Sequence, residues 1–182
     1  MGVTFMLKQL AVATSLVLLL LPVAVHAESF TSDKYGFSAD FPVSPTVSEP
    51  KGSEIDNEGN FIATMVMFSA HEPGTTSALV TVDSYAVSKK LNIAATLKAM
   101  RNDFIRGMEA KIVSSDPGTR DGHQALFFTY DTRDHSAAGS GIVIIISRKK
   151  PRTYLVVNMH TPAASAEQIV AADAFLASFH IK

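Results

Sequence analysis

Cysteine is missing from this chain of 182 residues. Without thiols the protein can contain no disulfide, no thiolate nucleophile and no iron–sulfur centre. A charge excess is missing too, because the chain has 16 lysine and arginine residues and 17 acidic residues. Such a balance creates no long-range field that would attract nucleic acid or an anionic membrane, so we expect no nucleic-acid partner.

The motifs of common metal, nucleotide and nucleophile sites are also missing. No two histidines stand at the HxH, HxxxH or HExxH spacing that brings metal ligands together. There is no P-loop, no GxGxxG and no GxSxG elbow. The nearest string is Gly139-Ser140-Gly141. It is better explained as a turn, made flexible by its glycines, that leads into the apolar run after it. We therefore predict no metal and no cofactor.

The N-terminus has the three-part layout of a secretory signal. Lys8 supplies a positive charge, an almost wholly apolar stretch follows at 10–21, and small or medium residues end at Ala27. The apolar stretch is shorter than the roughly 20 residues that a membrane span needs, which disfavours a retained membrane anchor. We predict that residues 1–27 are a cleavable signal peptide, cut before Glu28, and that the protein is periplasmic or secreted.

The remaining residues, 28–182, have about the modal size of one domain. That length is enough to bury a core without disulfides. No later stretch is long and apolar enough to span a membrane, so we expect no transmembrane segment after signal cleavage. We predict a single α+β domain at 28–182.

Short apolar runs alternate with turn residues along this domain. Pro73-Gly74 and Asp116-Pro117-Gly118 are typical of turns, and Lys149-Lys150-Pro151-Arg152 is typical of a basic hairpin loop. The predicted strands lie at 37–41, 46–49, 61–68, 78–87, 111–114, 124–131, 141–147 and 153–159.

Two stretches change to the three- and four-residue spacing of a helix. Asn92 can cap the first helix, and Ser165 with Gln168 forms a capping box for the second. The apolar face of the first helix consists of Ile93, Leu97, Met100, Phe104 and Met108. The apolar face of the second consists of Ile169, Ala172, Leu176 and Phe179. Since the methionines share a stripe with Ile, Leu and Phe, we interpret them as core residues.

The order of these elements predicts the fold class. Short links between successive strands favour an antiparallel sheet over parallel βαβ repeats. Strands such as 141–147 are apolar at consecutive positions, which predicts cover on both faces of the sheet, and the two helices are the available covers. We expect an α+β domain in which an antiparallel sheet of about six strands is flanked by helices, as an α/β/α sandwich.

Four stretches, in order along the chain, carry a resemblance to a known group of proteins. They are Lys34-Tyr35-Gly36-Phe37-Ser38-Ala39-Asp40-Phe41-Pro42, Asp121-Gly122-His123-Gln124-Ala125, Arg152-Thr153-Tyr154-Leu155-Val156-Val157 and Asp173-Ala174-Phe175-Leu176-Ala177-Ser178-Phe179-His180-Ile181. They resemble the first strand, the glycine turn before the long central strand, a late strand and the closing helix of the PsbP/Mog1-like superfamily.

This resemblance implies an antiparallel sheet between helices. It also implies an accessory, scaffold or binding role, because members of the superfamily serve mainly in such roles. The plant photosystem members bind metal ions and an oxygen-evolving complex, but no motif of this chain supports the transfer of those sites. Likeness of fold does not fix function.

Two polar clusters are candidate binding sites. Arg133, Asp134 and His135 follow the aromatic strand in a loop rich in small residues, where function is often found. A solvated turn is the alternative explanation. The second cluster contains Arg148, Lys149, Lys150 and Arg152, which could contact an anionic partner. The alternative is a hairpin tip that is charged only for solubility.

Three functional hypotheses remain open. We favour an exported, non-catalytic accessory or binding domain of the cell envelope, with an unidentified protein or small-molecule partner. The alternative is a periplasmic hydrolase, which requires that at least two histidines converge in one pocket. The histidines concerned are His71, His123, His135 and His160. A structural component of an envelope complex would instead expose an apolar patch on a sheet edge or face.

Overall fold

A computed structural model of the protein describes residues 27–182 apart from 49–53, 56–60, 85–91 and 148–150. The predicted signal peptide, except for Ala27, lies outside the described residues, and so do Arg148, Lys149 and Lys150. Among the described residues, no helix has the length and apolar character that crossing a membrane requires.

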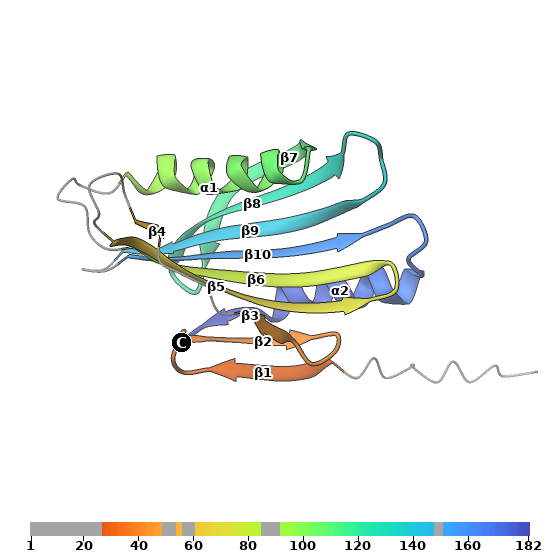
Figure 1. Cartoon of the computed structure of the whole chain (residues 1–182), viewed down its shortest axis with the longest axis horizontal. Coiled ribbons are helices and arrows are strands. Elements are labelled where there is room, and N and C mark those ends of the chain that lie inside the picture. The colour runs from red at the N-terminus through yellow and green to blue at the C-terminus, as the bar shows by residue number, and fades with distance from the viewer. Residues whose placement is uncertain (1–26, 49–53, 56–60, 85–91, 148–150) are drawn as a thin grey trace, which may run out of the picture.

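The main sheet is antiparallel throughout (Figure 1). Neighbouring strands pair in the order β3, β5, β6, β10, β9, β8, β7, and β4 pairs with β5. Their bounds are β3 (Thr46–Ser48), β4 (Glu54–Ile55), β5 (Phe61–Glu72), β6 (Thr75–Ser84), β7 (Ala110–Arg120), β8 (His123–Thr132), β9 (Ala138–Ile146) and β10 (Arg152–His160). The predicted α+β class with an antiparallel sheet is confirmed, although this sheet has more strands than the six or so expected.

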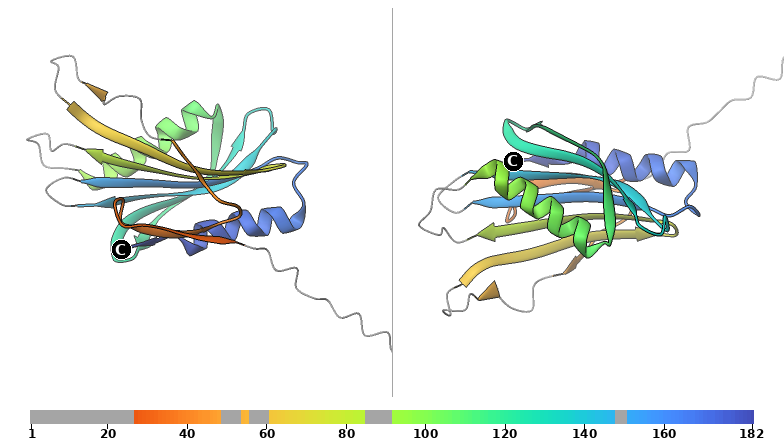
Figure 2. Two further views of the ribbon diagram at one scale, coloured as in Figure 1. Left: turned by 60° about the horizontal axis from the view of Figure 1, so that its bottom comes forward. Right: turned by 90° about the horizontal axis from the view of Figure 1, so that it is seen from above.

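A second, three-stranded sheet lies beside the first (Figure 2). Its central strand β2 (Phe37–Phe41) pairs with β1 (Glu28–Ser32) on one side and with β11 (His180–Ile181) on the other. The small sheet thus joins the start of the domain to the end of the chain. Sequence patterns predicted β2 but not β1, whose residues show no regular alternation of apolar and polar side chains.

Both predicted helices form, with the predicted caps. Helix α1 (Ile93–Gly107) begins where the side chain of Asn92 accepts a hydrogen bond from the backbone N–H of Ala95, at 3.1 Å. Helix α2 (Ala166–Ser178) begins with a complete capping box between Ser165 and Gln168.

The two faces of the main sheet are covered differently. Helix α1 packs on β7, β8 and β9 on one face (Figure 2, right). Helix α2 packs on β6 and β10 on the opposite face, next to the small sheet. The core under α1 contains Leu97, Ile105, Ala110, Leu126, Phe128, Tyr130, Val143, Ile145, Leu155 and Val157. The aromatic residues of the opposite core are Phe37, Phe41, Phe68, Tyr154, Phe175 and Phe179. The helices are therefore not the only covers, because the small sheet shares one face with α2.

The string Gly139-Ser140-Gly141 lies inside strand β9 and not in a turn. A Cβ atom at Gly139 would lie 2.1 Å from the carbonyl oxygen of Asn158, and one at Gly141 would lie 2.3 Å from the ring of Phe128. Phe128 and Tyr130 stand opposite these glycines on β8. The glycines thus leave room for two buried aromatic rings, which is a packing role and not a nucleophile elbow.

The predicted turn at Asp116-Pro117-Gly118 is wrong. Strand β7 runs through these residues and turns at Asp121 and Gly122, whose φ angles are 51° and 78°. Strand β7 is the last strand of the sheet, so Pro117 can stand in it without breaking a hydrogen bond to a further strand. The charge of Lys111 and a bulge near Val113 are further features that discourage pairing at such an edge.

Candidate functional site

The predicted loop around Arg133 connects β8 to β9 and is tightly held at its base. The backbone N–H and the hydroxyl of Thr132 both donate to the carbonyl oxygen of Ala137, at 2.8 and 3.0 Å. The Ala137 N–H in turn donates to the Thr132 hydroxyl oxygen at 3.0 Å. Thr132 and Ala137 are buried, so these bonds fix the loop in one geometry.

Within the loop, Asp134 forms a local turn with Ser136. Its carboxylate accepts hydrogen bonds from the Ser136 hydroxyl at 2.8 Å and from the Ser136 N–H at 3.1 Å. These bonds, that of the hydroxyl first, lower the pKa of Asp134 from its ordinary value of 3.8 to about 2. Asp134 thus remains charged at neutral pH and is engaged mainly with its own loop.

Two residues beside Arg133 have left-handed backbone conformations that glycine usually adopts. His135 has a φ of 57° and Glu109 has a φ of 50°. The carbonyl oxygen of Glu109, just after α1, accepts a hydrogen bond from the N–H of Arg133 at 3.2 Å. Such conformations cost of order 1–3 kcal/mol each and are found preferentially at functional sites. The backbone around Arg133 is therefore both strained and well anchored.

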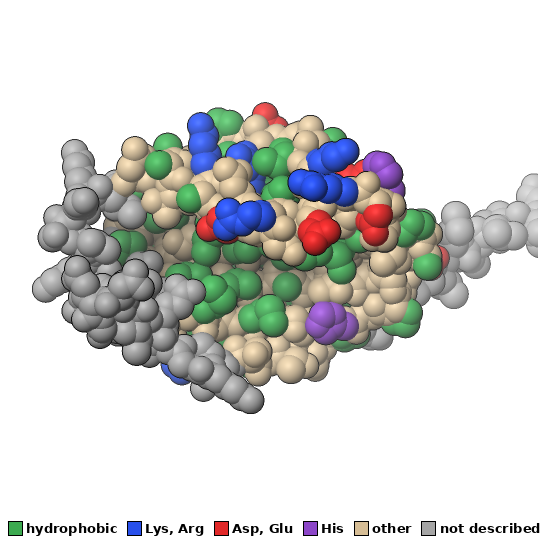
Figure 3. Space-filling view, turned by 45° about the horizontal axis from the view of Figure 1, so that its top comes forward, with side chains coloured by type: hydrophobic (Ala, Val, Ile, Leu, Met, Phe, Trp, Pro, Cys, Tyr) green, Lys and Arg blue, Asp and Glu red, His purple; other side chains and the backbone are tan. Residues whose placement is uncertain are grey.

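Two adjoining hollows, of about 520 and 390 Å³, lie where this loop meets the end of α1. Glu109 and Arg133 line both of them. The other lining residues are Asn102, Ile105, Arg106 and Ala110 in the larger hollow and Gly107, Met108, Thr132, Asp134 and Ser136 in the smaller one. We call these two hollows together the Arg133 surface. Figure 3 shows basic, acidic and histidine side chains gathered over this side of the molecule.

The two arginines of the Arg133 surface differ in whether they form an ion pair. Arg106 is bound to Asp103 at 2.8 Å, in an exposed pair one turn apart on α1. Arg133 is exposed, and within the described part of the chain its guanidinium makes no ion pair. Its guanidinium can therefore offer a planar set of donors to a carboxylate or phosphate outside the protein.

Arg152, the described member of the second candidate cluster, occupies a different place. It lies in β10 and not in a loop, and it is only 8 % exposed. Its guanidinium donates to both carboxylate oxygens of Asp83 at 2.5 Å and to the carbonyl oxygen of Lys34 at 3.4 Å. It also lies over the ring of Tyr35. The hydrogen bonds with Asp83 outweigh burial and raise the pKa of Arg152.

Arg152 and Arg133 lie at opposite ends of the sheet. In the register of the strands, Arg152 stands opposite Ile146 at the end of β9, whereas Arg133 belongs to the loop before Ala138 at its start. The structure therefore brings Arg133, Asp134 and His135 together and leaves Arg152 apart from them. Arg106 and Glu109 were not predicted, because nothing in the local sequence shows that the end of α1 meets this loop.

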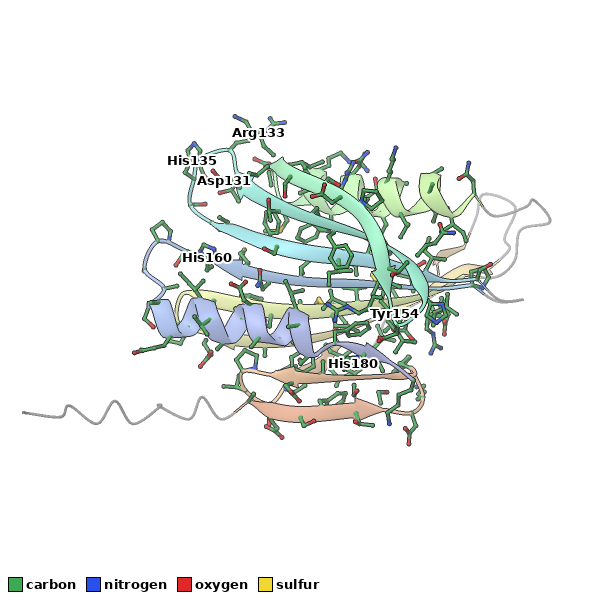
Figure 4. The ribbon with its side chains drawn as sticks, turned by 180° about the vertical axis from the view of Figure 1, so that it is seen from behind. Asp131, Arg133, His135, Tyr154, His160 and His180 are labelled. Carbon is green, nitrogen blue, oxygen red and sulfur yellow. The ribbon has the colours of Figure 1, made fainter. Side chains whose placement is uncertain are left out.

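The four candidate histidines, all among the described residues, do not converge on any of the hollows described here. His135 pairs with Asp131 at 2.5 Å, and His71 contacts the hydroxyl of Thr76 at 3.1 Å. His160 ends β10 near His135 in Figure 4, while His123 begins β8 at the other end of the sheet. None of the hollows described here is lined by a histidine. Across the described residues, no group of three His, Asp or Glu side chains could hold a metal ion.

Apolar side chains are exposed on one part of the sheet. Met65 and Met67 of β5 are 47 % and 39 % exposed, on the face of the sheet where α1 covers only β7, β8 and β9. Their neighbours Val66 and Phe68 point to the opposite face and are buried. From Met65 to Phe68 the strand is thus apolar on both faces, as predicted, and among the described residues only the face of Val66 and Phe68 is buried.

Comparison with known proteins identifies the fold. No family model matches the chain, and no curated protein matches it in sequence. The structure is similar to that of cyanobacterial PsbP (CyanoP) from Synechocystis sp. PCC 6803, with a TM-score of 0.56 and 15 % identity over 88 % of this chain and 96 % of CyanoP.

Two other solved structures are similar to a smaller degree. LpqN, involved in cell envelope biogenesis of Mycobacterium tuberculosis, gives a TM-score of 0.49 and 11 % identity over 78 % of this chain and 86 % of LpqN. A protein from Bacteroides thetaiotaomicron gives 0.45 and 13 % over 86 % of this chain and 49 % of its own length. At these identities the comparisons show a likeness of fold alone, and that conclusion rests on the match with CyanoP. The resemblance predicted from the sequence is thereby confirmed: the chain has a PsbP-like α+β fold.

Proposed function

We propose that this protein is an exported accessory protein of the cell envelope that binds a protein partner through the Arg133 surface. The observation that carries the proposal is the exposed Arg133 at the junction of two hollows, on a backbone held by Glu109 and Thr132. Strained, rigid backbone around an unpaired charge is a frequent feature of recognition sites.

The shape and charge of this surface favour a protein partner. Both hollows are lined by charged and polar side chains as well as apolar ones, unlike the mostly apolar pockets that hold small molecules. Arginine is enriched at protein interfaces and often dominates their binding energy. An acidic side chain of the partner would pair with Arg133, while the partly exposed Met108 would supply apolar contact.

The start of the domain supports export. Strand β1 begins at Glu28, which would become the N-terminus after the predicted cleavage. A cut before Glu28 would leave every pair of β1 with β2 intact, from Glu28 opposite Phe41 to Ser32 opposite Phe37. The cleavage site expected from the sequence thus lies immediately before the first described strand.

Charge reversal tests the binding site. The full chain, with a tag after Lys182, is expressed in its host and cross-linked in intact cells, and the captured proteins are compared among variants. We expect Arg133→Glu to abolish capture of a partner that the unchanged protein captures. Lys98→Glu, an equal charge reversal on the exposed side of α1, should preserve capture. Equal capture by both variants, or capture of no protein, would refute the proposal.

Sequencing of the N-terminus tests export. The protein isolated from the cell envelope or the medium should begin at Glu28. Ala27→Arg should block cleavage, because a signal peptidase requires a small residue at that position. Recovery of the uncut chain from the cytoplasm would contradict the export part of the proposal and leave the Arg133 surface to be judged separately.

A further inference from the structure

A second, separate groove lies on the opposite face of the sheet. Since α2 packs on β6, β10 and β2, it leaves part of β7, β8 and β9 open beside it. The resulting groove has a volume of about 310 Å³. Its floor and inner wall are apolar, made by Phe127, Gly141, Ile142, Leu176 and Ala177.

The local sequence keeps this floor open. A Cβ atom at Gly118 of β7 would lie 2.7 Å from the ring of Phe127, so glycine is required for the ring to lie where it does. The hydroxyls of Ser114 and Thr129 share a hydrogen bond of 2.8 Å at one end of the groove. The groove is therefore a formed feature of the sheet and not a gap between loose side chains.

Carboxylates stand on both walls of the groove. Asp116 belongs to β7 and is exposed, and Asp173 belongs to α2. One oxygen of Asp173 accepts a hydrogen bond from the side chain of Asn158 at 2.7 Å, and its other oxygen accepts none that the structure shows among the described residues. An apolar floor with an anion on each side is complementary to an apolar group that carries a positive charge.

The basic residue of the groove, Arg120, does not cancel this charge. Its guanidinium donates to the carbonyl oxygens of Ala177 at 3.1 Å and Leu176 at 3.3 Å. These carbonyls belong to the last turn of α2, the negative end of the helix dipole, and that turn contains no basic residue of its own. Arg120 thus interacts with the helix end, and the two carboxylates outnumber its single positive charge in the groove.

We propose that this groove binds a small organic ammonium ion with an apolar body. The apolar body would lie on Phe127 and Ile142, and the ammonium group would lie between Asp116 and Asp173. The volume is at the small end of the range for ligand pockets and suits a small amine. This site is distinct from the Arg133 surface and does not depend on it.

The test compares three probes of nearly equal shape. Benzylamine, benzyl alcohol and benzoate are titrated separately into the protein isolated after expression of the full chain, and backbone amide shifts are followed by NMR. Benzylamine should shift the amides of Thr129, Ser140 and Gly141 in a saturable way, benzyl alcohol should do so more weakly, and benzoate should not. Equal shifts with all three, or none with benzylamine, would overturn the proposal.

Variants locate the site. Asp116→Asn and Asp173→Asn should each weaken benzylamine binding by about three-fold, and together by about ten-fold, as expected for exposed charge pairs. Asp103→Asn on α1, outside the groove, should have no effect, and neither should Arg133→Glu. If Asp103→Asn weakens binding as much as Asp116→Asn does, the attraction belongs to the whole protein and not to the groove.

Discussion

Two arginines, Arg152 and Arg133, lie at opposite ends of the main sheet and show opposite uses of the same side chain. Arg152 is buried in β10 and makes two hydrogen bonds to Asp83 and one to the backbone of Lys34. Arg133 is exposed in the loop after β8, with its backbone held by Glu109 and its guanidinium in no ion pair among the described residues. Figure 4 labels Arg133 and Tyr154, which follows Arg152 by two residues in β10.

The difference teaches how burial decides the role of a charge. A buried guanidinium loses its hydration, and the loss is offset only if its partners are fixed and well aligned. Arg152 therefore ties the turn before β2 to β6 and β10, next to the Tyr154 hydroxyl that donates to the carbonyl oxygen of Tyr35 at 2.7 Å. An exposed guanidinium keeps its hydration and remains available to a partner.

Of the changes predicted here, removal of Arg152 should lower the free energy of unfolding most. Arg152→Ala removes the bidentate hydrogen bonds to Asp83 and the hydrogen bond to the turn before β2, so we expect the free energy of unfolding to fall by about 3 kcal/mol. Urea unfolding of the isolated protein measures this free energy. Arg152→Lys, which keeps the charge but not the two-pronged geometry, should fall between Ala and the unchanged protein. A loss below about 0.5 kcal/mol would mean that Arg152 is no anchor.

Loss of the Thr132 hydroxyl should have a smaller effect, at the other end of the sheet. Thr132→Val keeps the shape and the backbone hydrogen bond to Ala137 but removes the two hydrogen bonds of the hydroxyl with Ala137, for which we expect a loss of about 1–2 kcal/mol. Partner capture should weaken as well, since the loop would no longer hold Arg133 in place. Thr119→Val, the same substitution at an exposed position of β7 outside the Arg133 surface, is the matched control. Unchanged capture by Thr132→Val would show that a rigid loop is unnecessary.

Acid should loosen the Arg133 loop locally. Because the pKa of Asp134 is lowered from 3.8 to about 2, its turn with Ser136 is fully stabilised above pH 4 and is lost as the pH falls through about 2. NMR titration of the Ser136 amide should report this transition. In Asp134→Asn, which cannot titrate, the same signal should stay constant. A transition near the ordinary value in the unchanged protein would show that these hydrogen bonds do not persist in solution.

Truncation of Arg133 should have the smallest effect on stability. Arg133→Ala removes an exposed side chain without an observed ion pair, so the free energy of unfolding should stay within about 0.5 kcal/mol of the unchanged value. Partner capture should nevertheless be lost, as with Arg133→Glu. A large loss of stability would place Arg133, like Arg152, among the residues that hold the fold.

The local features of the fold could be predicted because they depend on neighbours in sequence. Strand β2 has the bounds expected from its alternation between Gly36 and Pro42. Helix α1 starts at the expected Asn92 cap, and the capping box of Ser165 marks the start of α2. In each case the side chain that signals the element contacts backbone only a few residues away.

Features that depend on distant segments could not be predicted. Strand β1 is a strand because β2 pairs with it, and Pro117 is tolerated because β7 has no further neighbour in the sheet. The candidate site shows the same division. Asp134 and Ser136 form their turn within three residues, whereas the contact of Arg133 with Glu109 joins a loop to the end of a helix.

The sequence by itself determined the caps, the periodicity of most strands and helices, and the place of a polar loop after the aromatic strand. Only the tertiary structure decided that Arg152 is an internal anchor and Arg133 an open contact, although both arginines stand in equally polar stretches of sequence. The reason is physical: the hydration that an arginine retains depends on which distant segments pack around it, and the residues beside it in sequence do not specify those segments.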